Sequence, residues 1–314
     1  MGLNLPLVTI GIPTYNRASG RLGDAIKCAL AQTYSNIEIV ISDNCSTDNT
    51  AEVVASFKCD KIRYIRQEKN IGPFNNFHAC LESAKGEYFY LFHDDDQVDA
   101  DFVESCIAAA NGRENVGLIR TGIRIIDGEG SVLKETLNNA GGLSSNEFIS
   151  AWLRHKTAFY LPCTLFNTDR LKEVGGIKSP HNMFCDVFAM VNLAARYDHV
   201  DIVEPKASFR RHDDNMGSSS NVLDWVYDSV DLLDLICRLF PGYELQLREE
   251  GNRFFCMKNY DQTRKMSVPL WKKTLMYFKV RKIFQHAAPL WKYYKAHEIR
   301  PRLAPFKNKL LGRT

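Results

Sequence analysis

The sequence predicts an α/β fold, with a mostly parallel central sheet, helices on both of its faces, and a helical C-terminal region. Short apolar, β-branched runs alternate four times with helix-like segments in the first 110 residues, which is typical of a parallel sheet joined by crossover helices. Polar clusters follow the first, second and fourth runs, at the sheet edge where such folds bind ligands. Beyond residue 242 the apolar spacing is mainly helical, with interruptions at prolines.

The expected elements follow from apolar spacing and from the residues that end each run. Strands are predicted over residues 7–13, 37–42, 62–65, 88–92, 116–126, 160–167, 200–204 and 207–211. Helices are predicted over residues 20–32, 46–57, 73–85, 186–196 and 223–240. The Gly- and Ser-rich loop at residues 217–221 predicts a boundary between a domain of residues 1–216 and a helical, basic region of residues 217–314.

The composition is that of a globular chain in a reducing compartment. Of the 314 residues, 45% are hydrophobic and 25% are charged, which excludes disorder over most of the chain. No apolar run reaches the roughly 18 residues of a membrane-spanning helix, and residues 1–6 lack a secretion signal. The nine cysteines are widely spaced and form no CxxC pair, which argues against a disulfide framework or a zinc site. We therefore expect a cytoplasmic protein.

The net charge of +3 hides a strong asymmetry. Residues 1–252 hold 24 Lys and Arg against 35 Asp and Glu, a net charge of −11, whereas residues 253–314 hold 16 against 2, a net charge of +14. A basic tail on an acidic body indicates a negatively charged partner for the tail.

Aromatic residues are interleaved with the cations over residues 270–314, which favours an anionic membrane surface as the partner. On a helical wheel, however, residues 270–284 do not separate into one basic and one apolar face. A helical cap with an ordinary basic surface is the alternative. Nucleic acid is disfavoured, because no recognition motif accompanies the charge.

Three consecutive carboxylates, Asp94, Asp95 and Asp96, follow the strand at residues 88–92. Such a run repels itself unless it is solvated or neutralised. Its hard oxygen atoms suit Mg²⁺ or Mn²⁺ that also holds a diphosphate. The alternative is an acidic turn that caps the next helix.

Asp43 also ends a buried strand. Its carboxylate could accept an N–H of uracil, thymine or guanine, whereas N3 of cytosine carries no hydrogen. A turn aspartate is the alternative. Asn70 and Gly72 precede a helix, where they could place backbone N–H groups near a ligand or form a simple loop-to-helix junction.

Two further clusters lie in the second half of the first domain. Arg210, Arg211 and His212 follow a short strand; they could neutralise a leaving diphosphate or form a solvated basic turn. Asp186 stands at a predicted helix start, where the helix dipole favours a carboxylate and where a general base is the functional alternative.

Several of these segments, in this order, resemble the family 2 glycosyltransferases, which are inverting, sugar-nucleotide-dependent enzymes of the GT-A fold. The matching segments are VTIGIPTYNR (residues 8–17), IVISDNCSTDNT (39–50), NIG (70–72) and GEYFYLFHDDD (86–96). The resemblance covers about residues 6–110, weakens over 111–215 and is absent after that. The segment SDNCSTD looks most like that of transferases that build bacterial O-antigen, capsule or similar surface glycans.

The resemblance implies roles for these residues. Asp43 would meet the base, and the nucleotide pocket would be lined by Pro13, Thr14 and Tyr15, with Arg17 nearby. Asp94, Asp95 and Asp96 would supply the ribose contact and the metal-bound diphosphate contact of the family's DxD motif, with Asp96 the favoured metal ligand. Many members have Asp-x-Asp-Asp here, so a motif shifted by one position would have His93 in place of its first carboxylate.

The implied reaction is a single displacement, assisted by Mn²⁺ or Mg²⁺. Asp186 would take the proton from an acceptor hydroxyl, and Arg210, Arg211 and His212 would lie near the diphosphate. The expected donor is a nucleotide sugar, with UDP favoured, and the expected acceptor is a glycan or a lipid-linked molecule. The protein would work in the cytoplasm or peripherally on the inner face of the plasma membrane.

Two other functions stay open from the sequence. A nucleotidyltransferase can also use an α/β sheet with carboxylate-bound Mg²⁺, but it would usually have a Gly-rich basic loop where residues 13–17 are PTYNR. A non-catalytic nucleotide- or glycan-binding module of the same fold is disfavoured by the intact carboxylates at positions 94–96 and 186.

Overall fold

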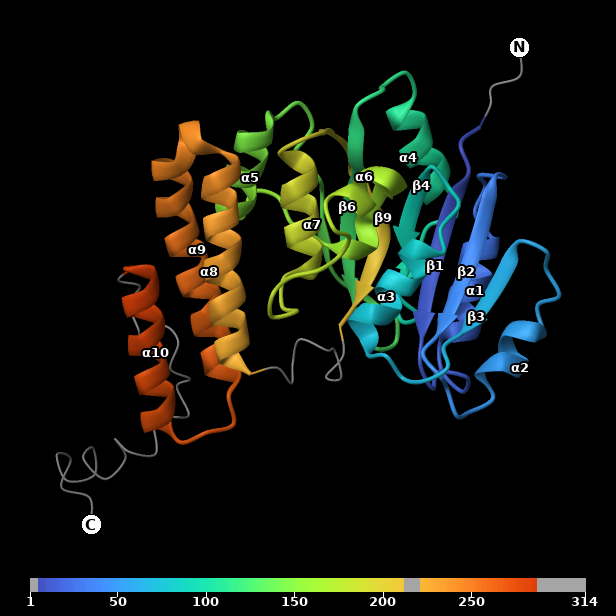
Figure 1. Ribbon diagram of the computed structural model, residues 1–314, viewed down its shortest axis with the longest axis horizontal. Coiled ribbons are helices and arrows are strands. Elements are labelled where there is room, and N and C mark those ends of the chain that lie inside the picture. The colour runs from blue at the N-terminus through green and yellow to red at the C-terminus, as the bar shows by residue number, and fades with distance from the viewer. Residues whose placement is uncertain (1–4, 212–220, 287–314) are drawn as a thin grey trace. The chain divides into compact units, whose positions relative to one another are not determined.

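A computed structural model describes residues 5–211 and 221–286 of the chain. The chain divides into two compact units, residues 1–219 and residues 220–314. The described part of the first unit is an α/β structure around one nine-stranded sheet, and that of the second is helical (Figure 1).

The first half of the sheet is parallel, as predicted. Its strands lie in the order β3-β2-β1-β4 and are joined by helices. The strands are β1 (Val8–Thr14), β2 (Ile37–Asp43), β3 (Ile62–Arg66) and β4 (Tyr88–Leu91). The helices are α1 (Leu22–Leu30), α2 (Thr50–Ala55) and α3 (Pro73–Glu82). Pro73 occupies the first turn of α3, where its missing N–H costs no helical hydrogen bond.

The second half of the sheet is mixed, in the order β4-β8-β6-β9-β5, with β7 paired to β6. Its strands are β5 (Gln97–Val98), β6 (Val116–Ile126), β7 (Val132–Thr136), β8 (Thr164–Asn167) and β9 (Asp198–Arg210). Its helices are α4 (Phe102–Ala110), α5 (Ser145–Leu153), α6 (Thr168–Glu173) and α7 (Cys185–Ala194). A 3₁₀ turn, η1 (Leu161–Cys163), precedes β8, so the strand predicted from residue 160 begins at Thr164.

The two strands predicted over residues 200–211 form one strand, β9. Pro205 interrupts the pattern in the sequence, because it cannot donate to a ladder. In the structure the pairing of β9 with β6 shifts register at Gly122, which lies opposite Pro205, and then continues. Since β8 is antiparallel to both β4 and β6, and β9 is parallel to β6, the carboxyl ends of β4, β6 and β9 lie at the same edge of the sheet.

Helices cover both faces of the sheet (Figure 1). One apolar core joins α1 and α4 to the inward side chains of the parallel strands, including Ile10, Ile39 and Tyr90. On the other face α3 contacts β1, β2 and β4, and α6 links α3 to α7. All nine cysteines are free, and six of them are buried, as expected of small apolar residues.

A buried ion pair connects β6 to β9. Arg120 and Asp201 have almost no exposed side-chain surface, and their atoms Nη2 and Oδ1 lie 2.5 Å apart. Arg120 also donates to the carbonyl of Ala158 and lies over the ring of Phe148 at 4.4 Å. Burial raises the pKa of Asp201, but the hydrogen bond to His199 and the charge of Arg120 outweigh it and lower the pKa to about 2. The ionised Asp201 carboxylate therefore contributes its full share of the free energy of unfolding above about pH 4, the usual pKa of an unfolded Asp. This share is lost as the pH falls toward 2 and the carboxylate is protonated.

The part of the second unit that the structure describes consists of three helices, α8 (Val222–Leu239), α9 (Glu244–Lys265) and α10 (Leu270–Phe284), with a 3₁₀ turn, η3 (Pro241–Tyr243), between the first two. Helix α9 contacts both α8 and α10. The buried amide of Asn259 donates to the hydroxyl of Ser229 between α9 and α8. None of the helices described in either unit is both long and apolar enough to cross a membrane.

We predict that Arg120→Met lowers the free energy of unfolding by about 3–5 kcal/mol, because it leaves the Asp201 carboxylate buried without its partner. Urea unfolding followed by far-UV circular dichroism measures the loss. The matched control is Lys27→Met, which removes an exposed ion pair with Asp24 and should cost less than about 1 kcal/mol. A stability of Arg120→Met equal to that of the control would contradict the prediction.

Candidate functional site

The candidate site lies where the carboxyl ends of the parallel strands meet. Thr14, Asp43 and Arg66 end β1, β2 and β3 in register with one another. The loop of residues 92–96 follows β4, and Arg210 ends β9 at the same edge. The strand topology thus brings together clusters that are up to about two hundred residues apart in the sequence.

The acidic loop after β4 is fixed by hydrogen bonds to two other strands. The hydroxyl of Thr14 donates to Oδ2 of Asp94 at 2.9 Å. The backbone N–H of Arg210 donates to Oδ1 of Asp96 at 2.9 Å. Nδ1 of His93 lies 3.5 Å from Oδ2 of Asp96, whose side chain is almost fully buried. The three carboxylates therefore have different surroundings: Asp94 faces β1, whereas Asp96 lies between His93 and β9.

Burial and neighbouring charges both shift the pKa values of this loop. Burial raises the pKa of both Asp94 and Asp96, because desolvation disfavours the charged carboxylate. Burial alone would lower the pKa of His93, but the adjacent Asp96 carboxylate and the charges of Asp95 and Asp94 outweigh burial and raise it. The loop therefore concentrates negative charge that a cation would stabilise.

Three of these side chains could hold a metal ion. One ligand atom from each of His93, Asp95 and Asp96 lies within 4.8 Å of the other two. Within the described residues, Oδ2 of Asp96 and Nε2 of His93 are buried without a hydrogen-bond partner, which is costly unless something satisfies them. The carboxylate oxygens suit Mn²⁺ or Mg²⁺, whereas an imidazole nitrogen is a ligand for transition metals rather than for Mg²⁺. The residues present therefore fit a divalent cation.

This grouping differs from the predicted metal set in one residue. The prediction placed Asp94 beside Asp95 and Asp96, but the geometry groups His93 with them and directs Asp94 to Thr14. The sequence carried a signal for this arrangement, since His93 stands where many members of the resembled family have the first carboxylate of Asp-x-Asp-Asp.

Arg210 holds the loop in place through backbone atoms. Its guanidinium donates to the carbonyls of Asp95, Asp127 and Gly128 at 2.8–3.0 Å, and it is 5% exposed. The adjacent Arg211 is exposed, and its N–H donates to the carbonyl of Ile126. Two of the three predicted diphosphate residues are described by the structure, and of these Arg211 is exposed whereas Arg210 is buried. The third, His212, lies outside the described residues. The diphosphate role of all three stays a prediction.

The loop after β1 is joined to the loop after β2. The N–H of Asn16 donates to the hydroxyl of Ser46, and the N–H of Thr47 donates to the side chain of Asn16. Pro13 and Thr14 are buried, whereas Tyr15 and Arg17 are exposed. Asn16 has a positive φ of 53°, which Asn tolerates better than most residues. The positive charge of Arg17 acts on Asp94, so this loop and the acidic loop are close.

Asp43, the predicted base contact, is 1% exposed and already has partners. Its Oδ1 accepts from the N–H of Ser46 at 2.8 Å, and its Oδ2 accepts from the hydroxyl of Tyr64 at 2.5 Å. Arg66 approaches Oδ2 at 3.7 Å. Each carboxylate oxygen has a second lone pair, so one further donor can be accommodated. Our reading of the sequence missed Tyr64 and Arg66, although the register between β2 and β3 places them at this strand end.

Asn70 and Gly72 form an ordered junction with the β2 loop. The side-chain amide of Asn44 donates to Oδ1 of Asn70, and its carbonyl oxygen accepts from the N–H of Ile71. Gly72 has a φ of 82°, a conformation that strongly favours glycine. The strand end at Asp43 and the start of α3 are therefore held together, whichever of the two predicted roles this segment has.

Asp186, the predicted general base, lies in the first turn of α7 and is partly buried. One of its carboxylate oxygens, Oδ1, accepts from the N–H of Val187. Tyr160 lies close to both Arg211 and Asp186, whose charges act on its phenol. Its ring stacks on that of Phe209 of β9, with 6.0 Å between the ring centres. Tyr160 was not among the predicted site residues and has no sequence signal beyond its place before η1.

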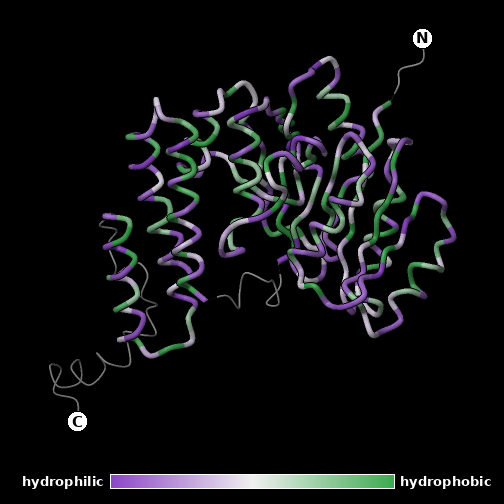
Figure 2. The backbone as a smooth tube through the Cα atoms, viewed as in Figure 1, coloured by the Kyte–Doolittle hydropathy of each residue, from purple (hydrophilic) through white to green (hydrophobic). Residues whose placement is uncertain are grey.

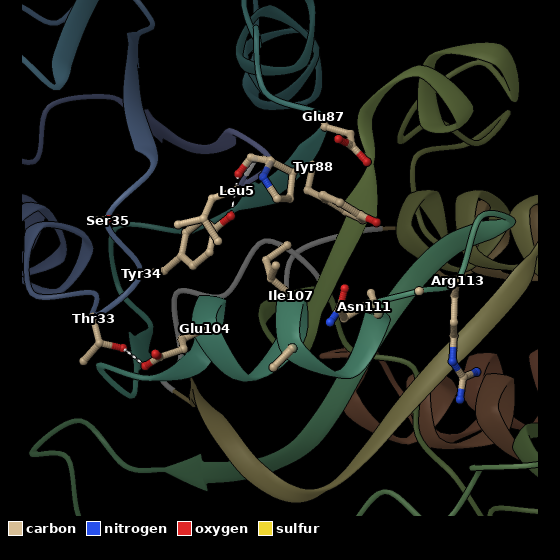
Figure 3. A pocket seen from close by; sticks show the side chains of 14 residues that line it. Leu5, Thr33, Tyr34, Ser35, Glu87, Tyr88, Glu104, Ile107, Asn111 and Arg113 are labelled. Carbon is tan, nitrogen blue, oxygen red and sulfur yellow. Dashed lines mark hydrogen bonds between the residues drawn. The ribbon is translucent and has the colours of Figure 1, made fainter. Parts of the chain in front are cut away.

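A separate pocket of about 490 Å³ lies at the opposite edge of the sheet. Leu5 and Tyr88, which line it, stand at the amino ends of β1 and β4. Figure 3 shows the hydroxyl of Thr33 bonded to Glu104 on one side of this pocket. None of the predicted site residues lines it, so its size does not bear on the candidate site.

The sequence of the chain is similar to parts of known proteins. A Rickettsia felis protein described as an uncharacterized glycosyltransferase is 39% identical over 136 residues, which are 43% of this chain and 22% of that protein. Chondroitin synthase of Pasteurella multocida is 27% identical over 198 residues, which are 63% of this chain and 20% of that protein. The chain thus spans about a fifth of the length of these relatives.

Solved structures share the fold. TarS 1-349 of S. aureus, in complex with UDP-GlcNAc, has a TM-score of 0.65 at 15% identity and covers 90% of this chain and 82% of its own. The mannosyltransferase PcManGT of Pyrobaculum calidifontis, in complex with GDP-Man and Mn²⁺, has a TM-score of 0.57 at 16% identity, over 98% of this chain and 83% of its own. At such identities the likeness shows the fold alone, and it confirms the predicted GT-A type of α/β fold with a helical C-terminal region.

The family model described as glycosyl transferase family 2 matches residues 9–173, which is just over half of the chain. The match includes β1 to β4, the acidic loop and β8, and therefore most of the edge at which the candidate site lies. The predicted family is thus confirmed, and the chain belongs to glycosyl transferase family 2.

Proposed function

We propose that the protein transfers a sugar from a nucleotide-sugar donor to a hydroxyl group of an acceptor, with inversion at the anomeric carbon. The observation that carries the proposal is the cluster of the buried Asp96 with the partly buried His93 and Asp95, which lies at the same sheet edge as Thr14 and Asp43 in a chain of this family. Such an edge can hold a diphosphate, a base and a cation together.

We assign the metal to His93, Asp95 and Asp96, because two of their atoms are buried without another partner. A bound Mn²⁺ or Mg²⁺ would supply positive charge for the departing nucleoside diphosphate. Arg211 and His212 would bind the same diphosphate from the end of β9, and Arg17 is an exposed cation near Asp94. Asp94 would contact the ribose, and Thr14 holds its carboxylate in place.

A uridine diphosphate sugar is the donor that we favour. Asp43 would accept the N3–H of uracil, since its carboxylate is held rigidly by Ser46 and Tyr64. Pro13, Tyr15, Asn70 and Gly72 would line the same pocket. The TarS neighbour is described with UDP-GlcNAc and the mannosyltransferase neighbour with GDP-Man, so the fold accommodates either base.

Asp186 would act as the general base. It would take the proton of the acceptor hydroxyl as the oxygen bonds to the anomeric carbon, while the bond from that carbon to the diphosphate oxygen breaks. The proton ends on the carboxylate, and the electron pair of the broken bond ends on the diphosphate. One displacement of this kind inverts the anomeric carbon.

We propose a glycan or a lipid-linked molecule as the acceptor, in the synthesis of a bacterial surface polysaccharide. Chondroitin and hyaluronan synthases are among the relatives, which supports a polysaccharide product. A cytoplasmic protein held peripherally at the inner face of the plasma membrane would meet both a soluble donor and a lipid-linked acceptor.

A panel of nucleotide sugars tests the reaction class. With Mn²⁺ present, we expect release of nucleoside diphosphate from a UDP-sugar and much less from a CDP-sugar, because N3 of cytosine offers no hydrogen to Asp43. Release of pyrophosphate from a nucleoside triphosphate and a sugar phosphate would instead identify a nucleotidyltransferase, and no release in any mixture would favour a binding module.

The base assignment predicts that Asp186→Asn lowers the rate of transfer by about 10²- to 10⁴-fold, because the amide cannot accept the acceptor's proton. Donor binding, measured by calorimetry with UDP and Mn²⁺, should change little. The control Asp198→Asn alters an exposed carboxylate at the start of β9 and should transfer normally. Full transfer by Asp186→Asn would exclude this residue as the base.

The metal assignment predicts different effects for neighbouring residues. Asp96→Asn and His93→Ala should weaken Mn²⁺ binding by roughly 10- to 100-fold, because each removes a ligand atom. Asp94→Asn should retain most of the affinity, because its oxygen is bound to Thr14. Electron paramagnetic resonance of Mn²⁺ in the presence of UDP measures the three affinities. An equal loss in Asp94→Asn would restore the metal set that the sequence alone suggested.

A further inference from the structure

The outward face of α10 carries a stripe of large apolar side chains. Trp271, Leu275 and Phe278 are 60%, 61% and 53% exposed, although side chains of this kind are usually buried. Their spacing of four and three residues places them on one side of the helix. We call these three residues the α10 stripe.

The stripe is not needed to hold α10 in the second unit. A different side of the helix is buried and packs on α9. There the ring centres of Tyr277 and Tyr260 lie 5.1 Å apart, and those of Phe284 and Phe255 lie 6.2 Å apart. Lys273 is also buried there, and its Nζ donates to the carbonyl of Arg264 near the end of α9. The helix is therefore anchored by one side and presents the stripe on another. Figure 2 shows that hydrophobic and hydrophilic positions are mixed along α10.

Positive charge borders the stripe. Lys272, Lys279, Arg281 and Lys282 of α10 are all exposed. The sequence has no acidic residue between Asp261 and Glu298, so no carboxylate of this helix opposes these cations. Nζ of Lys279 lies 5.9 Å from the ring centre of Tyr227 on α8, and this ring is itself 42% exposed.

We propose that α10 lies flat on an anionic lipid bilayer, with Trp271, Leu275 and Phe278 inserted between the headgroups and the flanking cations at the lipid phosphates. The helix has 15 residues and is about 22 Å long, which is too short to span the roughly 30 Å hydrocarbon core. Large apolar and aromatic side chains with Lys and Arg beside them are the composition of helices that lie in the interface. Nucleic acid would engage the cations and would leave the apolar stripe without a partner.

This inference names the surface that carries the membrane association proposed above, and on that point it rests on the proposed function. Lipid binding needs neither donor nor acceptor. It can therefore fail in a protein that transfers sugar normally, and it can succeed in one that does not.

The experiment uses the full chain and sedimentation with vesicles. Vesicles of phosphatidylcholine alone are compared with vesicles that also contain phosphatidylglycerol, which is anionic. We expect binding to the second kind, with weakening as salt increases. Leu275→Glu should lower the partition coefficient between water and the anionic vesicles at least tenfold. The new carboxylate is polar and has the same sign of charge as the lipid headgroups, and it would lie on the inserted face.

The matched control is Leu245→Glu. Leu245 lies in the first turn of α9, is 89% exposed and has Glu244, Glu249 and Glu250 on the same helix. It is thus an exposed leucine of the same unit outside the basic surface, and its substitution should leave lipid binding unchanged. Circular dichroism of both variants confirms that they are folded.

A second pair of variants tests the charges. The double variant Lys272→Gln/Lys279→Gln should bind anionic vesicles less tightly, by roughly fivefold for each residue at low salt. The control Lys85→Gln/Lys156→Gln replaces two exposed lysines of the first unit and should bind as the wild type does.

Fluorescence quenching tests the insertion of the stripe. Brominated lipid should quench the tryptophan fluorescence of the wild type more than that of Trp271→Phe, because an inserted indole reaches the bromine.

The results separate the alternatives. Equal binding by Leu275→Glu and the wild type would overturn the proposal and assign any lipid binding to other cationic residues. Equal quenching in Trp271→Phe would overturn insertion of the stripe. Retention on single-stranded RNA without any binding to anionic vesicles would replace the lipid surface by nucleic acid.

Discussion

Arg210 ties together the parts of the molecule on which the candidate site depends. Its backbone N–H binds Asp96, and its guanidinium binds the carbonyls of Asp95, Asp127 and Gly128. One side chain thus joins the loop after β4, the loop after β6 and the end of β9. These contacts involve only atoms of the chain itself, and they position the acidic loop for a nucleotide or a cation. Preorganisation of this kind removes an ordering cost from binding.

The same contacts explain why a costly charge arrangement is tolerated. Burial raises the pKa of Asp94 and Asp96, which means that their charged forms are destabilised. Thr14 and the N–H of Arg210 offset part of this cost, but Oδ2 of Asp96 and Nε2 of His93 stay buried without a hydrogen bond. A divalent cation, as proposed for this site, would offset the remaining cost.

Local patterns in the sequence were enough to predict the parallel strands, because each is a compact apolar run that ends in a turn or a polar cluster. The short strands β5 and β7 and the helices α5 and α6 were missed, although α5 begins with a capping box formed by Ser144 and Glu147. Asp96 accepts a hydrogen bond from the N–H of Arg210, which is 114 residues away, and no local pattern encodes such a contact. Only the unusual His93 gave a sequence-level hint of the metal grouping.

Helix α10 shows a different limit of sequence analysis. A helical wheel of residues 270–284 mixes apolar and basic positions, because the helix has two apolar sides: Tyr277 and Phe284 face α9, whereas Trp271 and Leu275 are exposed. Only the structure separates the two sets.

The proposed membrane association gives a physical reason for the charge asymmetry of the chain. Residues 1–252, with a net charge of −11, would be repelled by an anionic bilayer, so attraction to it requires a separate basic element. The positive charge is concentrated outside residues 9–173, the part that matches the family, where it can serve attachment without disturbing the negative charge of the acidic loop.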